Sequence, residues 1–423
     1  SSKEGYDLYI TQDSIILNSK TAEGAFRGIQ TIRQIIPETS NDTLSENKMW
    51  LIPTGKIIDN PNFEYRGSML DVARHFFSVE DVKKYIDILA YYKINTLHLH
   101  LTDDQGWRIE IKSWPKLTEI GGSSEVGGGP GGFYTQEEYK DIVAYAAKHF
   151  ITIVPEVDMP GHTNAASVAY PILNGNGKTP KIYTGTEVGF STFDANKDTV
   201  YAFIDDVVRE ISAITPGPYF HAGGDESHVT KKKDFIHFVS KVDKIVKKYG
   251  KKMIGWDEIV HADIDTSAIA QFWANEENAK LAVEKGLKVI LSPGKKAYLD
   301  MKYDTLSKYG LNWAGLIPVD TGYVWTPERY VQGINKENIL GIEAPLWSET
   351  VSNMDEVEYL AFPRMIGYSE LSWSVEENRN WDNYKVRLGN QAPYLDKMNV
   401  KYYPSELIEW KKSKYTYKTI EKD

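Results

Sequence analysis

Apolar positions along the chain follow two alternating patterns from about residue 60 onward. Short apolar runs, rich in branched and aromatic side chains, alternate with longer stretches whose apolar residues recur every three or four positions. The first pattern predicts buried β-strands and the second predicts amphipathic helices. The predicted strands are residues 67–72, 96–101, 151–157, 219–222, 253–256, 268–273, 289–292 and 339–347.

The stretches between these strands carry the expected signals of helix ends. Ser78 and Thr135 each precede a helical pattern and are followed three residues later by an acidic residue, which is the spacing of a capping box. Gly250 and Gly286 stand where a helix commonly ends in a left-handed residue. The predicted helices are residues 79–92, 136–149, 200–214, 235–249 and 276–285.

Eight such β units in sequence predict an α/β fold of the (β/α)8 TIM-barrel type. A doubly wound open sheet is the alternative, but it would usually carry a phosphate-binding loop after its first strand, and the sequence has none there. Two short strands at residues 6–11 and 14–18 and a helix at 21–36 come before the barrel. Turn chemistry at residues 59–62 then favours two domains, a partial N-terminal α/β domain (1–58) and a catalytic barrel (59–423).

Composition narrows the classes of function. The chain has 423 residues and a net charge of −10, which disfavours a nucleic-acid partner. It has no cysteine, hence no disulfide or thiolate metal site, and no apolar stretch long enough to predict a membrane span. Aromatic residues make up 12%, a content that suits stacking on sugar rings. The opening residues resemble the interior of a longer chain, so we expect an excised fragment of a larger protein.

Charged and tryptophan side chains follow nearly every predicted strand. In a TIM barrel the carboxyl ends of the strands meet at one face, where catalytic groups gather. We therefore expect a polar pocket with aromatic walls at that face. The residues concerned are Asp71, Arg74, His98, His100, Asp103, Glu156, Asp158, His162, His221, Asp225, Glu226, Trp256, Asp257, Glu258, Trp273, Trp347 and Glu349.

The densest of these clusters, residues 221–226, resembles the signature of a known protein family. The run His221-Ala222-Gly223-Gly224-Asp225-Glu226 resembles the H-x-G-G-D-E signature of family 20 glycoside hydrolases, the β-N-acetylhexosaminidases. The resemblance covers residues 60–390 in order, with Ala222 replacing the usual bulky aliphatic residue, and the N-terminal segment resembles only the last part of the family's small domain. The other matching segments are residues 65–76, 98–108, 155–162, 255–258, 298–300 and 343–349.

The adjacency of Asp225 and Glu226 itself limits the mechanism. Side chains of neighbouring residues diverge at a strand end, so this pair is poorly suited to face each other across a glycosidic bond as acid and nucleophile. The resemblance implies substrate-assisted catalysis instead, in which the 2-acetamido oxygen attacks the anomeric carbon and forms an oxazolinium ion. Glu226 is then the general acid and later the base, and Asp225 holds and stabilises the acetamido N–H.

The resemblance also implies the residues that bind the substrate. Tyr298 is expected to orient the acetamido oxygen. Arg66 is expected to bind hydroxyls of the terminal sugar, although a structural salt bridge with Asp71 or Asp103 at the barrel end is the alternative. The remaining expected binding residues are Trp256, Trp273 and Trp347 as aromatic walls, and Asp300 and Glu349 as hydroxyl ligands.

A second set of residues is expected behind the carboxylate pair. The resemblance places Asp103 and His162 in an Asp–His relay that touches Glu226, with Asp158 beside them. Such neighbours tune the pKa of a general acid. The alternative is a buried network that only holds the strand ends.

These inferences predict an exo-acting, retaining β-N-acetylhexosaminidase that releases terminal β-linked GlcNAc, or GalNAc, and needs no cofactor or metal. Its expected partner is a glycan, at a secreted or bacterial cell-surface location, and the loops at residues 121–132 and 313–325 are expected to select the aglycone. A disaccharide-releasing relative such as a lacto-N-biosidase is one alternative. A non-catalytic sugar-binding module is another. The last is a metal-dependent barrel hydrolase with ligands His98, His100, His162 and Asp225.

Overall fold

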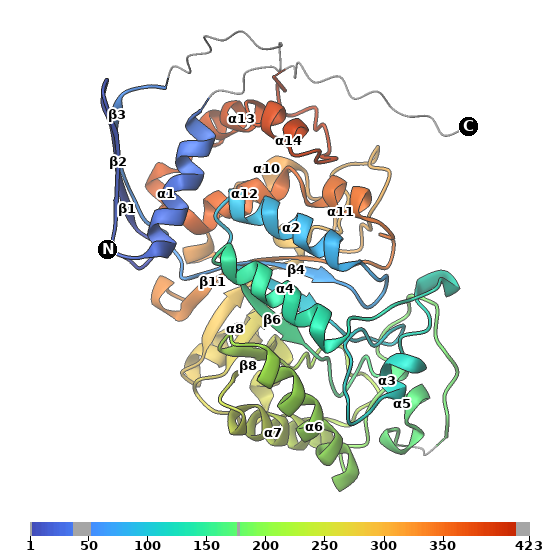
Figure 1. Ribbon diagram of the computed structural model, residues 1–423. Helices are drawn as coiled ribbons and strands as arrows, with labels where there is room; N and C mark the ends of the chain where they lie inside the picture. Colours follow the sequence, from blue (N-terminus) through green and yellow to red (C-terminus); the bar gives the residue numbers. More distant parts are fainter. Residues whose placement is uncertain (1, 37–51, 176–177, 412–423) are drawn as a thin grey trace, which may run out of the picture.

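The computed structural model describes residues 2–36, 52–175 and 178–411 (Figure 1). Eight parallel strands form a closed barrel, in which β11 pairs with β4 and closes the ring. The predicted barrel is confirmed, and each predicted strand matches an observed one to within two residues at either end. The strands are β4 (Tyr65–Asp71), β5 (Thr96–His100), β6 (Thr152–Glu156), β7 (Tyr219–His221), β8 (Lys252–Trp256), β9 (Ile269–Phe272), β10 (Lys288–Leu291) and β11 (Ile339–Leu346).

Helices surround this barrel, and their ends follow the sequence signals. Ser78 and Thr135 both form complete capping boxes, and Gly250 and Gly286 are left-handed, with φ of 74° and 82°. No described helix has the length and apolar character needed to cross a bilayer. The larger helices are α2 (Val79–Tyr91), α4 (Gln136–Lys148), α6 (Asp198–Ile214), α7 (Lys232–Lys248), α8 (Glu276–Glu284), α11 (Met354–Ala361), α12 (Arg364–Trp373) and α13 (Trp381–Gly389). Shorter helices are α3 (Lys116–Glu119), α5 (Asn164–Ala169), α9 (Gly294–Ala297), α10 (Val319–Tyr323) and α14 (Ala392–Lys397).

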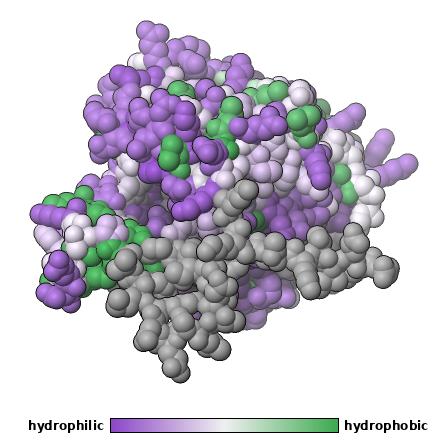
Figure 2. Space-filling model, turned by 90° about the horizontal axis from the view of Figure 1, so that it is seen from above, coloured by the Kyte–Doolittle hydropathy of each residue, from purple (hydrophilic) through white to green (hydrophobic). Residues whose placement is uncertain are grey.

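The N-terminal residues form a small antiparallel sheet in the order β2-β1-β3, against which α1 (Ala22–Ile35) packs. Its strands are β1 (Tyr6–Ile10), β2 (Ile15–Ser19) and β3 (Gly55–Asp59). The sequence predicted the first two but not β3, a short edge strand of half-polar sequence that is exposed along most of its length. Figure 2 shows apolar side chains gathered on the side where these strands lie, and the exposed residues there include Ile15, Ile16 and Ile58.

Arg66 lies at the amino-terminal end of the barrel, where the small sheet is attached. It is the second residue of β4, is fully buried, and pairs with Glu4, a residue that also accepts a hydrogen bond from Arg27. Five residues of extended strand, about 16 Å, separate it from Asp71 at the carboxyl end. The expectation that Arg66 binds substrate is therefore wrong, and its ion-pair partner is Glu4 rather than Asp71 or Asp103.

Candidate active site

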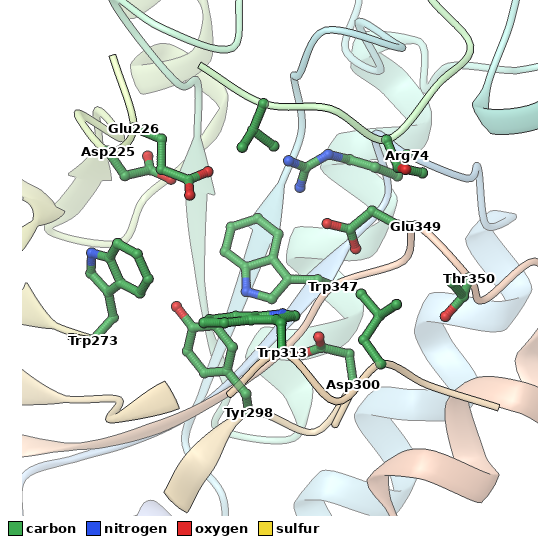
Figure 3. A pocket seen from close by; sticks show the side chains of 13 residues that line it. Arg74, Asp225, Glu226, Trp273, Tyr298, Asp300, Trp313, Trp347, Glu349 and Thr350 are labelled. Atoms are coloured by element: carbon green, nitrogen blue, oxygen red, sulfur yellow. The ribbon is translucent and has the colours of Figure 1, made fainter. Parts of the chain in front are cut away.

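A cavity of about 290 Å³ opens at the carboxyl ends of the barrel strands (Figure 3). This volume is near the lower limit for ligand pockets and suits a compact ligand such as one sugar ring. The lining side chains come from the segments that follow the carboxyl ends of barrel strands. They are Arg74, Thr186, Val188, Asp225, Glu226, Trp273, Tyr298, Asp300, Leu311, Trp313, Trp347, Glu349 and Thr350.

The loop after β7 brings Asp225 and Glu226 to this cavity. Gly223 has φ of 64°, and a Cβ atom there would lie 1.7 Å from Asp158 Oδ1, so only glycine fits. Asp158 Oδ1 in turn accepts a hydrogen bond from the Gly224 N–H at 3.0 Å. Glu226 itself has φ of 44°, a conformation that is costly for a residue with a side chain and that persists chiefly at functional sites. The two glycines and Asp158 thus hold a strained turn that presents both carboxylates.

The structure brings together the predicted Asp–His relay behind these carboxylates. His162 Nδ1 lies 3.1 Å from Asp103 Oδ1, and His162 Nε2 lies 3.6 Å from both Asp225 Oδ2 and Glu226 Oε2. The second oxygen of Asp103 is 2.9 Å from Arg74 Nη2. His162 therefore stands between a fully paired carboxylate and the two carboxylates that face the cavity.

The carboxylates of this group differ in their preference for a proton. Burial, with the nearby Asp158 and Glu226, raises the pKa of Asp225 well above its usual range. Burial likewise raises the pKa of Asp158 to about 7. Burial alone would also raise the pKa of Glu226, but the contact with His162 at 3.6 Å and the charges of His162 and Arg74 outweigh it and lower that pKa. A proton consequently resides on Asp225 and Asp158 before it resides on Glu226.

Polar groups without partners gather at the other end of the cavity. Asp300 is 1% exposed, and neither of its carboxylate oxygens has a hydrogen-bond partner among the described residues. Glu349 Oε2 lacks one as well within the same part of the chain. Because unpaired buried polar groups are costly, these oxygens point to a ligand that supplies several donors. A sugar ring supplies them as hydroxyls.

Arg74 completes this end of the cavity and was not among the predicted binding residues. Its guanidinium pairs with Asp71 and Asp103, and its Cζ lies 5.0 Å from the centroid of the Trp347 ring. The signal that could have found it is its position three residues after the end of β4, on the face where catalytic groups gather. Arg66 belongs to the same motif but lies at the opposite, amino-terminal end of that buried strand.

Aromatic side chains form the walls, with one exception to the prediction. Tyr298, Trp273 and Trp347 line the cavity as expected. Trp256 does not; it is 1% exposed, its ring centroid is 5.6 Å from that of Trp347, and its indole N–H donates to Glu156 inside the barrel. Trp256 therefore supports the wall from behind. The sequence did not single out Trp313 by itself; it is 58% exposed and stands at the rim, 5.7 Å from the Tyr298 ring.

The ligand set required by the metal-dependent alternative is not assembled. His98 and His100 lie inside the barrel, and both ring nitrogens of each are engaged by carboxylates. His98 bridges Glu156 and Glu343, while His100 bridges Glu156 and Asp103. Among the described residues, no metal-sized group combines either histidine with His162 and Asp225. These histidines serve a buried hydrogen-bond network.

Comparison with known proteins gives a consistent assignment. Residues 63–376 match the catalytic-domain model of glycosyl hydrolase family 20, and residues 1–60 match the model of that family's domain 2. The chain is 38% identical to a β-N-acetylhexosaminidase of Cellulomonas fimi, over 96% of this chain and 82% of the relative. It is 37% identical to a β-hexosaminidase of Porphyromonas gingivalis, over 95% of this chain and 55% of that longer protein.

Solved structures agree with this likeness. A family 20 β-N-acetylhexosaminidase from Streptomyces coelicolor superposes with a TM-score of 0.94 at 46% identity, over 97% of this chain and 84% of the other. A mutant β-hexosaminidase from Streptomyces plicatus, solved with its product GlcNAc, gives the same TM-score, identity and coverage. On the family-model matches and these identities, the chain belongs to glycosyl hydrolase family 20.

Proposed function

We propose that this chain is an exo-acting, retaining β-N-acetylhexosaminidase in which the substrate's own acetamido group is the nucleophile. The observation that carries the proposal is the pairing of two features in one cavity. Adjacent carboxylates on a strained turn occupy one end, and at the other end Asp300 and Glu349 carry buried oxygens that have no partner among the described residues. The first feature serves the acetamido and leaving groups, and the second serves the hydroxyls of a single terminal sugar.

The first chemical step uses the carboxylate end. The acetamido oxygen attacks the anomeric carbon while the bond to the aglycone oxygen breaks, and Glu226 gives its proton to that oxygen. Asp225 accepts a hydrogen bond from the acetamido N–H and stabilises the positive charge of the oxazolinium ion. Tyr298, whose hydroxyl faces the carboxylates in Figure 3, donates to the attacking oxygen and orients it. In the second step water attacks the anomeric carbon and gives a proton to the Glu226 carboxylate, while the bond between that carbon and the acetamido oxygen breaks and the acetamido group is restored.

Substrate binding gives Asp225 and Glu226 the protonation states that these two steps require. Glu226 must be protonated and Asp225 ionised, the reverse of their preferences without substrate. An acetamido N–H that donates to Asp225 favours its charged form and lowers its pKa. His162 Nε2, at 3.6 Å from both carboxylates, is placed to pass the released proton to Glu226. Substrate binding would thereby protonate Glu226, the form in which it acts as the general acid.

The other end of the cavity supports release of a single sugar. Arg74, Asp300 and Glu349 gather there, and they are the residues we propose to bind the hydroxyls of the terminal ring. A disaccharide-releasing enzyme needs space for a second ring beyond this point. The volume of about 290 Å³ favours the monosaccharide.

Substrate comparison tests the mechanism directly. The enzyme should cleave 4-nitrophenyl N-acetyl-β-glucosaminide with retention and should not measurably cleave the matching glucoside, which has a plain 2-hydroxyl and no internal nucleophile. A thiazoline analogue of the oxazolinium ion should inhibit strongly, since it resembles the intermediate. Trapping a covalent sugar on Asp225, or observing an inverted product, would refute the mechanism. Release of disaccharide from a natural glycan would support the alternative specificity.

We also propose that the enzyme acts outside the cell, secreted or at the bacterial surface, where cell-wall or host glycans carry such terminal sugars. Cell fractionation with an antibody to the chain tests this location. Recovery of all the protein in the cytoplasmic fraction would contradict it.

A further inference from the structure

Two acidic residues of the motif after β8 lie near the active site but outside the cavity lining. Asp257 is fully buried, and neither it nor Glu258 contributes to the cavity surface. The mechanism proposed above uses neither residue. Their hydrogen bonds instead lead to Trp273, the first residue after β9.

Asp257 holds the backbone at Trp273. Its Oδ2 accepts a hydrogen bond from the Trp273 N–H at 3.1 Å, and its Oδ1 accepts one from Asn278 Nδ2 at 2.7 Å. The carboxylate thereby joins the end of β9 to the start of α8. The position of the Trp273 main chain is set by this contact.

Glu258 holds the side chain of Trp273, whose main chain Asp257 holds. The indole Nε1–H of Trp273 donates to Glu258 Oε2 at 3.2 Å, and within the described part of the chain this is its one hydrogen bond. In Figure 3 the indole nitrogen points away from the cavity, while the opposite edge of the ring faces the space between Asp225 and Tyr298. Trp273 is thus anchored at its backbone and at its ring, and the free edge of the ring bounds the cavity.

We infer that Glu258 is a positioning residue that holds the Trp273 indole in place and thereby limits the size of the 2-acyl group that the enzyme accepts. The inference rests on the proposed function, because it assigns the space bounded by Asp225, Trp273 and Tyr298 to the acetamido group. An indole free to swing outward would enlarge that space. The expected consequence is a loss of discrimination against acyl groups longer than acetyl.

The electrostatic environment of Glu258 makes the test sharper. Burial, then the charges of Asp257 and Asp225, raises the pKa of Glu258 well above its usual range and so favours its neutral form. Glutamine resembles that neutral form in shape and keeps an acceptor oxygen. Methionine has a similar size and no charge but offers only a weak acceptor.

The experiment compares Glu258→Gln with Glu258→Met on 4-nitrophenyl glycosides that carry N-acetyl, N-propanoyl or plain hydroxyl groups at position 2. In wild type the extra methylene of the propanoyl group should lower kcat/KM by roughly 10- to 200-fold. In Glu258→Gln the ratio of kcat/KM for the N-acetyl substrate to kcat/KM for the N-propanoyl substrate should stay within about twofold of the wild-type ratio. In Glu258→Met the same ratio should be lower than in wild type by roughly 2- to 10-fold, the effect of one neutral hydrogen bond. Glu258→Ala removes the same acceptor without adding bulk and gives a second readout if the methionine variant does not fold.

A matched control is Glu277→Met on α8, where the side chain is 80% exposed and contacts Lys280. It should leave the acetyl-to-propanoyl ratio unchanged. An unchanged ratio in Glu258→Met and Glu258→Ala, whatever their overall activity, would overturn the inference while leaving the proposed function intact. Equal cleavage of the 2-hydroxyl substrate by wild type would instead refute the proposed function, and this inference with it.

Discussion

Replacing Asp300 with asparagine should have opposite effects on stability and activity. The buried carboxyl has no hydrogen-bond partner among the described residues, and burial together with Glu349 raises its pKa well above the usual range. A buried neutral polar group left without partners costs about 1–3 kcal/mol, and a charge increases this cost by a similar amount or more. Asparagine is left without partners too, but it cannot ionise and avoids the added cost of the charge, so the variant should be the more stable protein in the absence of substrate.

The size of both effects can be worked from general magnitudes. For 423 residues the entropy of unfolding makes each kcal/mol worth about 1 °C in Tm, so the gain should be about 1–3 °C at pH 7. Because the pKa of Asp300 is higher in the folded state, the wild-type protein loses stability as the pH rises above the unfolded-state pKa of this carboxyl, about 3.9. The stability gained by Asp300→Asn should therefore vanish below about pH 4. Loss of one charged hydrogen bond to a sugar hydroxyl costs about 1.5–3 kcal/mol, which lowers kcat/KM roughly 10- to 150-fold.

The assay pairs thermal unfolding over a pH series with kinetics on the chromogenic N-acetylglucosaminide. Asp304→Asn is the matched control, four residues further along. Asp304 accepts hydrogen bonds from the Leu306 N–H at 2.9 Å and from Tyr403, so its replacement should lower Tm and leave kinetics unchanged. A lower Tm for Asp300→Asn together with normal kcat/KM would show that Asp300 is a structural residue and refute the reasoning.

Three further substitutions test other parts of the site. Glu226→Gln should lower kcat roughly 10²- to 10⁴-fold for natural glycans and less for substrates with acidic leaving groups, measured by product release; near-normal turnover of natural glycans would remove Glu226 as the acid. His162→Gln removes the neighbouring charge that lowers the pKa of Glu226, so the alkaline limb of the kcat/KM–pH profile should move to higher pH, and an unmoved limb would contradict the relay. Arg66→Met removes one of the two buried cations that pair with Glu4, so it should lower the free energy of unfolding by about 3–5 kcal/mol and leave KM unchanged. A raised KM would show that Arg66 does contribute to substrate binding.

The strands, the longer helices and the class of chemistry could be predicted because their signals are local. Burial of β4 to β11 imposes apolar runs, and packing of one helix face imposes a period near 3.6, whatever lies elsewhere in the chain. Caps such as those at Ser78 and Thr135 depend on contacts three residues apart. The adjacency of Asp225 and Glu226 is also local, and it was enough to disfavour two carboxylates facing across a bond.

The end of the barrel at which a side chain emerges is decided by tertiary structure. Arg66 and Arg74 belong to one motif, yet the first pairs with Glu4 in the turn before β1, while Asp71 and Asp103 hold the second beside the cavity. No local pattern tells which of two arginines near a strand will meet a distant carboxylate. The strand register and the attachment of the N-terminal sheet make that choice.

Which tryptophan forms the cavity wall is decided in the same way. Trp256 is the last residue of β8 and Trp273 is the first after β9, but Trp256 turns inward to Glu156, whereas Trp273 is held at the surface of the cavity by Asp257 and Glu258. The sequence by itself determined that aromatic and acidic residues would collect at one face of a barrel, because strand ends are set by local periodicity. Only the folded chain decided which of them face the substrate, because a side chain's direction depends on the partners that long-range contacts bring to it.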